Sequence, residues 1–432
     1  MGASVNIALP AIGKEFSLDA VLLSWVATSY FLATAMFLVP FGKIADIYGR
    51  KKIFLYGVLF YTFSSLLCGL SNSAVMLILF RILQGLGSAM IAGTGIAILT
   101  SVFPPRERGK VLGINVAAVY LGLTLGPFLG GFLTQHLGWR SIFFINVPLG
   151  LIIVLFIFWK LKAEWAEAKG ESFDFVGSVF YSISLVAVMY GFSLLPHISG
   201  FTLVLIGILV FLLFLKWELK VETPVLDIKL FKSNTAFAFS NFAAFLNYSA
   251  TFSVSFLLSL YLQYIKAITP QKAGLILAFQ SIVMAIFSPF AGRLSDRFEP
   301  RIIASIGMMI TDLSLLLFIF LSSNTPLMFI IGNLMLLGLG VALFASPNTN
   351  AVMSAVERKF YGVASAIRGT MRLVGQVFSM GIAMLIFSIH IGKVQINPQN
   401  YSKFLISIKT AFTVFTILCF IGIFASLAKG NN

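Results

Sequence analysis

Residues 42–52 read GKIADIYGRKK, and the stretch that begins at Gly292 reads GRLSDRFEPR. Each starts with a glycine and a cation and carries an aspartate four residues after that glycine. The positions that match at an offset of 250 or 253 residues are Asp46 and Asp296, Gly57 and Gly307, Gly85 and Gly338, and Gly87 and Gly340. A nearly constant offset through successive segments indicates that the chain is a tandem duplication.

The composition predicts that lipid surrounds most of the chain. Of 432 residues, 59% are apolar and only 10% are charged, whereas soluble domains carry about 25% charged residues. Mean hydropathy is +0.98. Thirteen apolar runs are long enough to span a bilayer, at 19–42, 53–71, 74–101, 111–135, 141–161, 175–195, 200–217, 236–263, 271–292, 301–322, 326–346, 361–388 and 405–428. Residues 1–12 are apolar but too short to cross, so we expect them to be the second half of a fourteenth helix, incomplete in this sequence.

The duplication and the apolar runs together predict an all-α membrane protein. Twelve of the helices form two six-helix bundles, as in transporters built from repeats about an axis along the membrane normal. The extra pair, 175–195 and 200–217, lies between the two halves. The predicted domains are therefore 1–161, an inserted hairpin with linkers at 162–222, and 223–432.

The distribution of cations predicts the orientation in the cell membrane. The net charge is +15, and we attribute it to membrane topology and anionic lipid rather than to nucleic acid. If residues 42–52 are cytoplasmic, 20 of the 30 Lys and Arg residues lie in cytoplasmic segments, seven lie in outer segments and three lie within helices. The positive-inside rule then favours a multi-pass protein with both termini in the cytoplasm.

Motifs for enzymatic chemistry are missing from the sequence. Both cysteines lie in apolar runs, and neither a zinc spacing nor an HExxH, GxSxG or phosphate-binding glycine loop is present. We therefore expect no cofactor, no metal and no enzymatic activity. Transport by such a chain would take its energy from an ion gradient rather than from a nucleotide.

Several segments together resemble the major facilitator superfamily. Residues 42–52 match its signature between the second and third helices. LILFRILQGLGSAM at 77–90 resembles its fourth-helix signature, and GLTLGPFLGG at 122–131 resembles the fifth-helix signature of antiporters. The segments that resemble the fourteen-helix drug–proton antiporters of the QacA/EmrB type are GWRSIFFINVPLG at 138–150, PVLDIKLFKS at 224–233 and FASPNTNAVM at 344–353. The resemblance covers essentially the whole chain.

This resemblance implies alternating access, in which two bundles rock about a central cavity. The conformational latch it implies comprises Gly42, Asp46, Gly49, Arg50 and Asp296. The antiporter-type helix contains Gly122, Gly126, Pro127, Gly130 and Gly131. Small residues four apart let helix backbones approach closely, and the proline removes one helical hydrogen bond. Static packing and rocking both remain open as the role of these glycines.

Proton coupling has no obvious carrier in this sequence. In exporters of this branch an aspartate near the middle of the first helix is usual, and its position here falls on Met1. Asp312 is the only acid deep within an apolar span, and an ionisable residue there is a functional candidate. The repeat places it opposite Thr62, and its helix corresponds to one that usually supports the bundle from the periphery. A carboxyl group satisfied by a neighbouring helix, or protonated, is the alternative.

Three arginines lie within helices that are expected to face the cavity: Arg81, Arg368 and Arg372. We assign Arg81 to proton coupling or gating. Arg368 and Arg372 are four residues apart and so share a helix face. With polar neighbours they form the predicted substrate cavity, made of Gln84, Asn115, Asn247, Gln280, Asn333, Arg368 and Arg372. Such a cavity would prefer acidic or neutral amphiphiles over organic cations; the alternative is a purely structural role in gating and helix contacts.

The sequence therefore predicts a secondary exporter of small amphipathic compounds that works by proton exchange. Its expected partners are the substrate, protons and membrane lipid, and we expect a monomer. The alternative within transport is an exporter of an anionic or lipid-like metabolite with different or no proton coupling. A membrane receptor or membrane-embedded enzyme on the same scaffold would require a catalytic cluster or an attached soluble domain, and the sequence shows neither.

Overall fold

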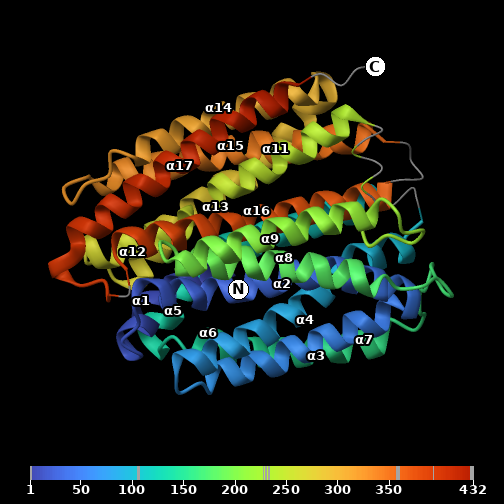
Figure 1. Cartoon of the computed structure of the whole chain (residues 1–432), viewed down its shortest axis with the longest axis horizontal. Coiled ribbons are helices and arrows are strands. Elements are labelled where there is room, and N and C mark those ends of the chain that lie inside the picture. Colours follow the sequence, from blue (N-terminus) through green and yellow to red (C-terminus); the bar gives the residue numbers. More distant parts are fainter. Residues whose placement is uncertain are drawn as a thin grey trace. The chain divides into compact units, whose positions relative to one another are not determined.

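A computed structural model describes residues 2–104, 108–226, 228, 231, 234–356, 361–392 and 394–428, and throughout these residues every regular element is a helix (Figure 1). The first group comprises α1 (Gly2–Glu15), α2 (Ala20–Tyr48), α3 (Arg50–Gly69), α4 (Ala74–Val102), α5 (Arg108–Leu137), α6 (Ser141–Phe144) and α7 (Asn146–Lys160). The hairpin is α8 (Phe175–Leu194) and α9 (Ile198–Glu218). The last group comprises α11 (Thr235–Thr251), α12 (Val254–Leu260), the π-helix η1 (Tyr261–Ile265), α13 (Pro270–Arg297), α14 (Pro300–Phe318), α15 (Leu327–Ser354), α16 (Tyr361–His390), the 3₁₀ turn η3 (Pro398–Asn400) and α17 (Tyr401–Leu427). The expected all-α class is confirmed.

Twelve helical spans within the described residues are long and apolar enough to cross a membrane. Their starts follow from local chemistry, because polar side chains accept hydrogen bonds from otherwise unpaired backbone N–H groups in the first turn. Ser73, Asp174, Asn234 and Thr269 cap α4, α8, α11 and α13 in this way. The predicted runs therefore begin within one or two residues of these helices.

Contacts divide the described chain into two compact units. Unit 1 contains residues 1–23, 118–139 and 229–432, and unit 2 contains residues 24–117 and 140–228. This division cuts through α5, whereas the predicted domain boundaries at residues 161 and 222 follow linkers and stay a prediction.

Matched glycines pack in the same way in the two units. In unit 2 a Cβ atom added to Gly85 on α4 would lie 2.5 Å from the carbonyl oxygen of Tyr30 on α2. In unit 1 a Cβ added to Gly338 on α15 would meet the carbonyl oxygen of Gln280 on α13 equally closely. Tyr30 and Gln280 are themselves 250 residues apart. The repeat thus specifies the same backbone-to-backbone helix crossing twice.

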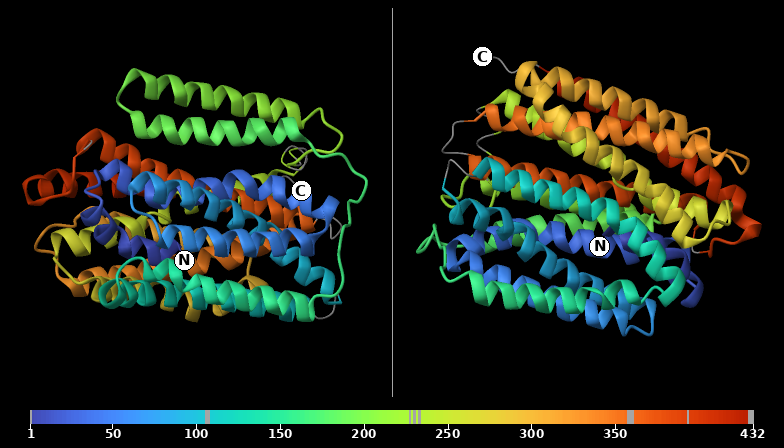
Figure 2. Two further views of the ribbon diagram at one scale, coloured as in Figure 1. Left: turned by 90° about the horizontal axis from the view of Figure 1, so that it is seen from below. Right: turned by 180° about the vertical axis from the view of Figure 1, so that it is seen from behind.

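The inserted hairpin belongs to unit 2. Helices α8 and α9 run side by side, and a single extended linker connects α7 to α8 (Figure 2). Tyr181 on α8 donates its hydroxyl to the carbonyl oxygen of Ala35 on α2 at 3.1 Å. The hairpin is therefore fastened to the helix that carries the 42–52 motif.

Candidate functional site

The 42–52 motif is mostly helix and not a loop. Helix α2 continues to Tyr48, and Gly49 alone separates it from α3. Gly49 has φ +119°, a conformation that glycine adopts readily, so the chain reverses in one residue. The expected short loop is thus a single-residue turn. It places Asp46, on the last turn of α2, against Arg50, on the first turn of α3, with 2.7 Å between Oδ1 and Nε.

A segment far away in the sequence covers this turn. We call residues 161–174, between α7 and α8, the strap. Glu167 binds Arg50 with both carboxylate oxygens, at 2.6 Å from Nη1 and 2.9 Å from Nη2. Ser101 on α4 accepts a further hydrogen bond from Nη1 at 2.7 Å. Arg50 is only 8% exposed, so its charge is neutralised by two acids in a partly dry site.

The strap also binds the backbone of the turn. Ala168 N–H donates to the carbonyl oxygen of Asp46 at 2.9 Å, and Arg50 N–H donates to that of Trp165 at 2.8 Å. Glu164 accepts a hydrogen bond from Lys51 N–H at 2.8 Å, which caps the start of α3. The sequence analysis did not assign the strap a role. Its available signal was the row of acids in KAEWAEAKGESFD, which is complementary to the cations at 50–52.

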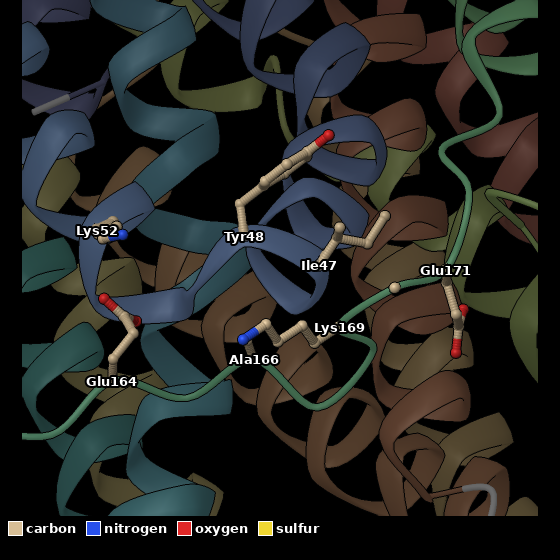
Figure 3. Close-up of a pocket in the computed structure, with 8 residues that line it drawn as sticks. Ile47, Tyr48, Lys52, Glu164, Ala166, Lys169 and Glu171 are labelled. Atoms are coloured by element: carbon tan, nitrogen blue, oxygen red, sulfur yellow. The ribbon is translucent and has the colours of Figure 1, made fainter.

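A shallow groove of about 460 Å³ lies between the strap and the turn (Figure 3). Lys52, Lys169, Glu164 and Glu171 bring charges of both signs to it, and Tyr48 lies at its edge. Glu171 is already paired with Lys43, with 2.6 Å between Nζ and Oε2. The mixed charges give the groove no preference for either an anion or a cation.

The second motif has a different environment. Asp296, at the end of α13, is exposed and accepts a hydrogen bond from Asn350 on α15 at 3.4 Å. Asn350 also donates to Ser295 at 2.6 Å. No ion pair to Asp296 is found within the part of the chain that the structure describes.

Arg81 lies wholly inside unit 2. Its side chain is 0% exposed, and it donates from Nε to the carbonyl oxygen of Val26 at 3.1 Å and from Nη1 to Gln84 at 2.6 Å. The rings of Tyr30 and Phe143 lie 4.3 and 5.9 Å from its guanidinium carbon. A carbonyl, an amide and two aromatic faces therefore stabilise this charge without a carboxylate.

The predicted cavity residues are divided between the units. Gln84 and Asn115 lie in unit 2, whereas Asn247, Gln280, Asn333, Arg368 and Arg372 lie in unit 1. Their joint role as a cavity lining stays a prediction.

Several of these side chains have local partners. The Gln84 amide is fully engaged, because its nitrogen donates to Ser65 at 2.7 Å. Asn333 and Ser314 each donate a hydrogen bond to the other's backbone carbonyl at 3.0 Å, joining α15 to α14. Arg368 donates to the carbonyl oxygen of Ala345 at 3.5 Å. These contacts hold helices together in this conformation.

The outer half of the antiporter-type helix packs tightly within unit 1. A Cβ added to Gly130 would lie 2.7 Å from Cα of Ser4 on α1, and one added to Gly131 would lie 2.5 Å from the carbonyl oxygen of Pro270 on α13. The carbonyl oxygen of Pro127 meets Gly274 on α13 equally closely. Gly126 accepts a hydrogen bond from Ser4 at 2.8 Å, while Gly122 has no atom of this kind within 4 Å.

Asp312 lies on α14, a helix that packs against α15 and α17 in unit 1. Its side chain is half-buried, and Oδ1 is buried with no hydrogen-bond partner among the described residues. No described group of three or more His, Cys, Asp and Glu side chains could hold a metal ion.

The sequence analysis missed a second buried pair of acids. Asp174 and Glu218, at the base of the hairpin, are 7% and 1% exposed. Both carboxylates approach Gly177, and Trp217 donates its indole N–H to Asp174 at 3.1 Å. Glu218 accepts a hydrogen bond from Leu226 N–H at 2.9 Å, which ties the following linker to α9. Because the two acids lie 44 residues apart, only the antiparallel hairpin brings them together.

Comparison with solved structures supports the fold. A bacterial homologue of the human lysosomal transporter Spinster, solved in an inward-facing and unoccupied conformation, matches with a TM-score of 0.71 at 16% identity, over 98% of this chain and 93% of that one. The peptide transporter POT matches with a TM-score of 0.69 at 14% identity, over 98% and 90% of the two chains.

Comparison with characterised sequences supports the family. The riboflavin transporter RibZ of Clostridioides difficile (strain 630) is 31% identical over 98% of this chain and 92% of its own. The multidrug resistance protein Stp of Mycobacterium tuberculosis (strain CDC 1551 / Oshkosh) is 33% identical over 88% and 71%. Multidrug resistance protein 3 of Bacillus subtilis (strain 168) is 30% identical over 83% and 71%. The family model for the Major Facilitator Superfamily matches residues 1–219 and 240–430. The chain is therefore a multi-pass membrane transporter, not an enzyme, and it belongs to the Major Facilitator Superfamily.

Proposed function

We propose that the chain is a proton-coupled exporter of small amphipathic, drug-like compounds, of the fourteen-helix QacA/EmrB type. The observation that carries this proposal is the close packing of the antiporter-type segment of α5, where Gly130 and Gly131 approach the backbones of α1 and α13. Helices in backbone contact can shift past each other with little rearrangement of side chains, as rocking requires. Two of the relatives above are named as multidrug resistance proteins, which supports export.

Asp312 and Arg81 divide the gating and proton roles in this proposal. A guanidinium stays charged in proteins, so Arg81 can steer helices but cannot carry the transported proton. Asp312 is a carboxyl group within an apolar span, and one of its buried oxygens lacks a partner in the described chain. We therefore assign the proton to Asp312 and the gating contact to Arg81.

The substrate, in this proposal, meets polar groups that helix packing leaves unused. Asn247 is 0% exposed, and neither atom of its amide has a partner among the described residues. The Nε atom of Arg372 also lacks a partner there. Two arginines four residues apart on α16 favour neutral or acidic amphiphiles, because a bound organic cation would meet like charge.

A second candidate function is the transport of riboflavin or a similar polar heteroaromatic compound. The relative RibZ favours it, since the match extends over 98% of this chain and 92% of that protein. Riboflavin is neutral and planar, and it carries hydroxyls and an imide that could pair with amides such as Asn247. Export of an anionic or lipid-like metabolite is the remaining transport alternative.

Flux measurements in proteoliposomes test these proposals. The panel is a cationic dye, riboflavin and an anionic fluorescein derivative, each measured with and without a pH gradient and an uncoupler. The main proposal expects gradient-driven movement of an amphipathic dye that the uncoupler stops. Riboflavin flux without dye flux would support the second candidate, and flux indifferent to the gradient would exclude proton coupling. Binding without any flux would point to a receptor.

Topology and oligomeric state complete the proposal. Both termini should lie in the cytoplasm, as the cation distribution favours, and the transporter should act as a monomer. Tags at residue 1 and residue 432 should be reached by a protease only after cells are opened. Light scattering of the detergent-solubilised protein should give the mass of one chain, 47.2 kDa plus detergent.

A further inference from the structure

Helix α1 carries a proline within an otherwise regular helix. Pro10 has no N–H group, so the carbonyl oxygen of Asn6, one turn earlier, loses its helical donor. Asn6 is only 4% exposed, so water cannot readily replace that donor. A buried carbonyl in this position requires a hydrogen bond from another part of the chain.

Unit 1 supplies this donor from α12 and the π-helix that follows it. Ser259 donates its hydroxyl to the carbonyl oxygen of Asn6 at 2.8 Å. Gln263 donates to the next carbonyl oxygen, that of Ile7, at 3.0 Å, and to Ser259 Oγ at 3.0 Å. Ser259 and Gln263 are four residues apart and so lie on one face. The pair therefore reads two successive carbonyls of α1.

This arrangement differs from most hydroxyl contacts in the protein. Ser407 on α17, for example, is equally buried and donates to the carbonyl oxygen of Lys403 in its own helix at 2.9 Å. Ser259 instead crosses to a helix some 250 residues away in the sequence. Gln263 lies in a π-helical turn, and such turns often mark functional sites.

We propose that the carbonyl freed by Pro10 is a releasable docking point, and that Ser259 and Gln263 lock α1 to α12 in this conformation. The inference rests on the proposed function, because alternating access requires contacts of this kind to open once in each cycle. Main-chain carbonyls suit this role. No charge pair has to be separated when they are released, and water can hydrate them once the contact opens. Ser259 and Gln263 are positioning residues and need not touch the substrate.

A cysteine reporter measures the lock directly. In a Cys68→Ala, Cys419→Ala background, Ala8→Cys on α1 lies in a fully buried position. Ser259→Ala should raise its rate of labelling by an impermeant maleimide about fivefold, the effect of one hydrogen bond of average net strength. Ser407→Ala is the matched control and should leave the rate unchanged. Equal rates in the Ser259→Ala variant and the parent would overturn the proposal.

A second reporter separates a lock from simple loosening. Thr349→Cys lies on α15 beside Asn350, which bonds to Ser295 at the end of α13 opposite to Pro270. A released lock shifts the population between facing states, so labelling at Thr349→Cys should fall at least twofold as labelling at Ala8→Cys rises. If Ser259→Ala raises both rates, the contact is only structural.

Pro10→Ala tests the chemical origin of the lock. It restores an N–H group at residue 10, which can bond to the carbonyl oxygen of Asn6 within α1. Labelling at Ala8→Cys should then rise as in Ser259→Ala, and the double variant should show no further increase. Additive effects would exclude the freed carbonyl as the docking point. These assays need no substrate, so the lock can hold even if the flux measurements refute proton-driven export.

Discussion

The two copies of the repeated motif share a pattern but not an environment. At the first turn Asp46 is paired with Arg50, which also binds Glu167. At the second turn Asp296 is exposed, with Asn350 as its hydrogen-bond partner. The position equivalent to Arg50 is Pro300 at the offset of 250.

Their backbones differ for a related reason. Gly49 has φ +119°, whereas its equivalent, Glu299, has φ −57°. The strap can approach the first turn because Gly49 carries no side chain there: an added Cβ would lie 2.6 Å from Cδ of Glu164. The inserted hairpin thus affects the first half of the repeat through the linker that precedes it. Sequence symmetry alone does not make the two latch aspartates equivalent.

The largest expected effect comes from removing the shared cation of the first turn. Arg50→Ala leaves Asp46 and Glu167 without their partner, and we expect it to lower the free energy of unfolding by about 2 kcal/mol. Transport should fall at least tenfold. Thermal unfolding in detergent and proteoliposome flux measure the two effects. Arg297→Ala, an exposed cation of the second turn, is the control and should change stability by less than about 0.5 kcal/mol. Equal effects of the two variants would remove the asymmetry.

A methyl group at the first turn should have the next largest effect. Gly49→Ala combines the strain of a positive φ with a contact to Glu164, and should cost about 1.5 kcal/mol of unfolding free energy. Gly138→Ala adds the same strain at φ +80° in open space, so it should cost less. Urea or thermal unfolding of both variants gives the difference, and a larger loss at Gly138 would show that the strap tolerates the added methyl group.

Removing one charge of the strap tests the link to the hairpin. Glu167→Gln should lower the free energy of unfolding by about 1 kcal/mol, since Glu167 is partly exposed and solvent screens its pair with Arg50. High salt should shrink the difference from the parent protein, because it screens partly exposed pairs. Glu299→Gln removes the partner of Arg301 in the second turn and should have a smaller effect. A salt-independent loss would argue that Glu167 acts by packing and not by charge.

The smallest change in stability should come from the aspartates themselves, although their effect on transport should differ. Asp46→Asn keeps the shape and weakens one pair, so we expect a loss of about 0.5 kcal/mol. Flux should fall severalfold because the first latch is altered. Asp296→Asn changes an exposed group and should retain more flux. Normal flux in Asp46→Asn, at normal protein yield, would remove the latch role from the first motif.

Much of the fold could be predicted because the bilayer imposes it. A helix that crosses lipid needs about twenty apolar residues, so hydropathy located spans such as 53–71 and 301–322 to within a few residues of α3 and α14. The matched glycines could be predicted for the same reason, since backbone contact between helices requires small residues wherever it occurs. The lack of an acid beside Arg81 could also be read from the sequence, but its carbonyl and aromatic partners could not.

The candidate site was harder to predict because its contacts join distant segments. Nothing local to Arg50 indicates that Glu167 lies against it, and the row of acids in the strap would equally suit a solvated linker. Gln84 was predicted to face substrate, yet its amide is occupied by Arg81 and Ser65 in this conformation. Polar residues in a helix signal that a partner is needed, while the partner's identity depends on packing.

By itself, the sequence determined the helical class, the membrane spans, the duplication and the superfamily, because apolar length and small-residue spacing act through local and repeated physical constraints. Only the tertiary structure decided that the strap neutralises Arg50, that Asp174 meets Glu218 and that Ser259 takes the carbonyl freed by Pro10. Each of these contacts joins groups 40 to 250 residues apart. A buried charge or carbonyl must find a partner, but which segment provides it depends on how the helices pack.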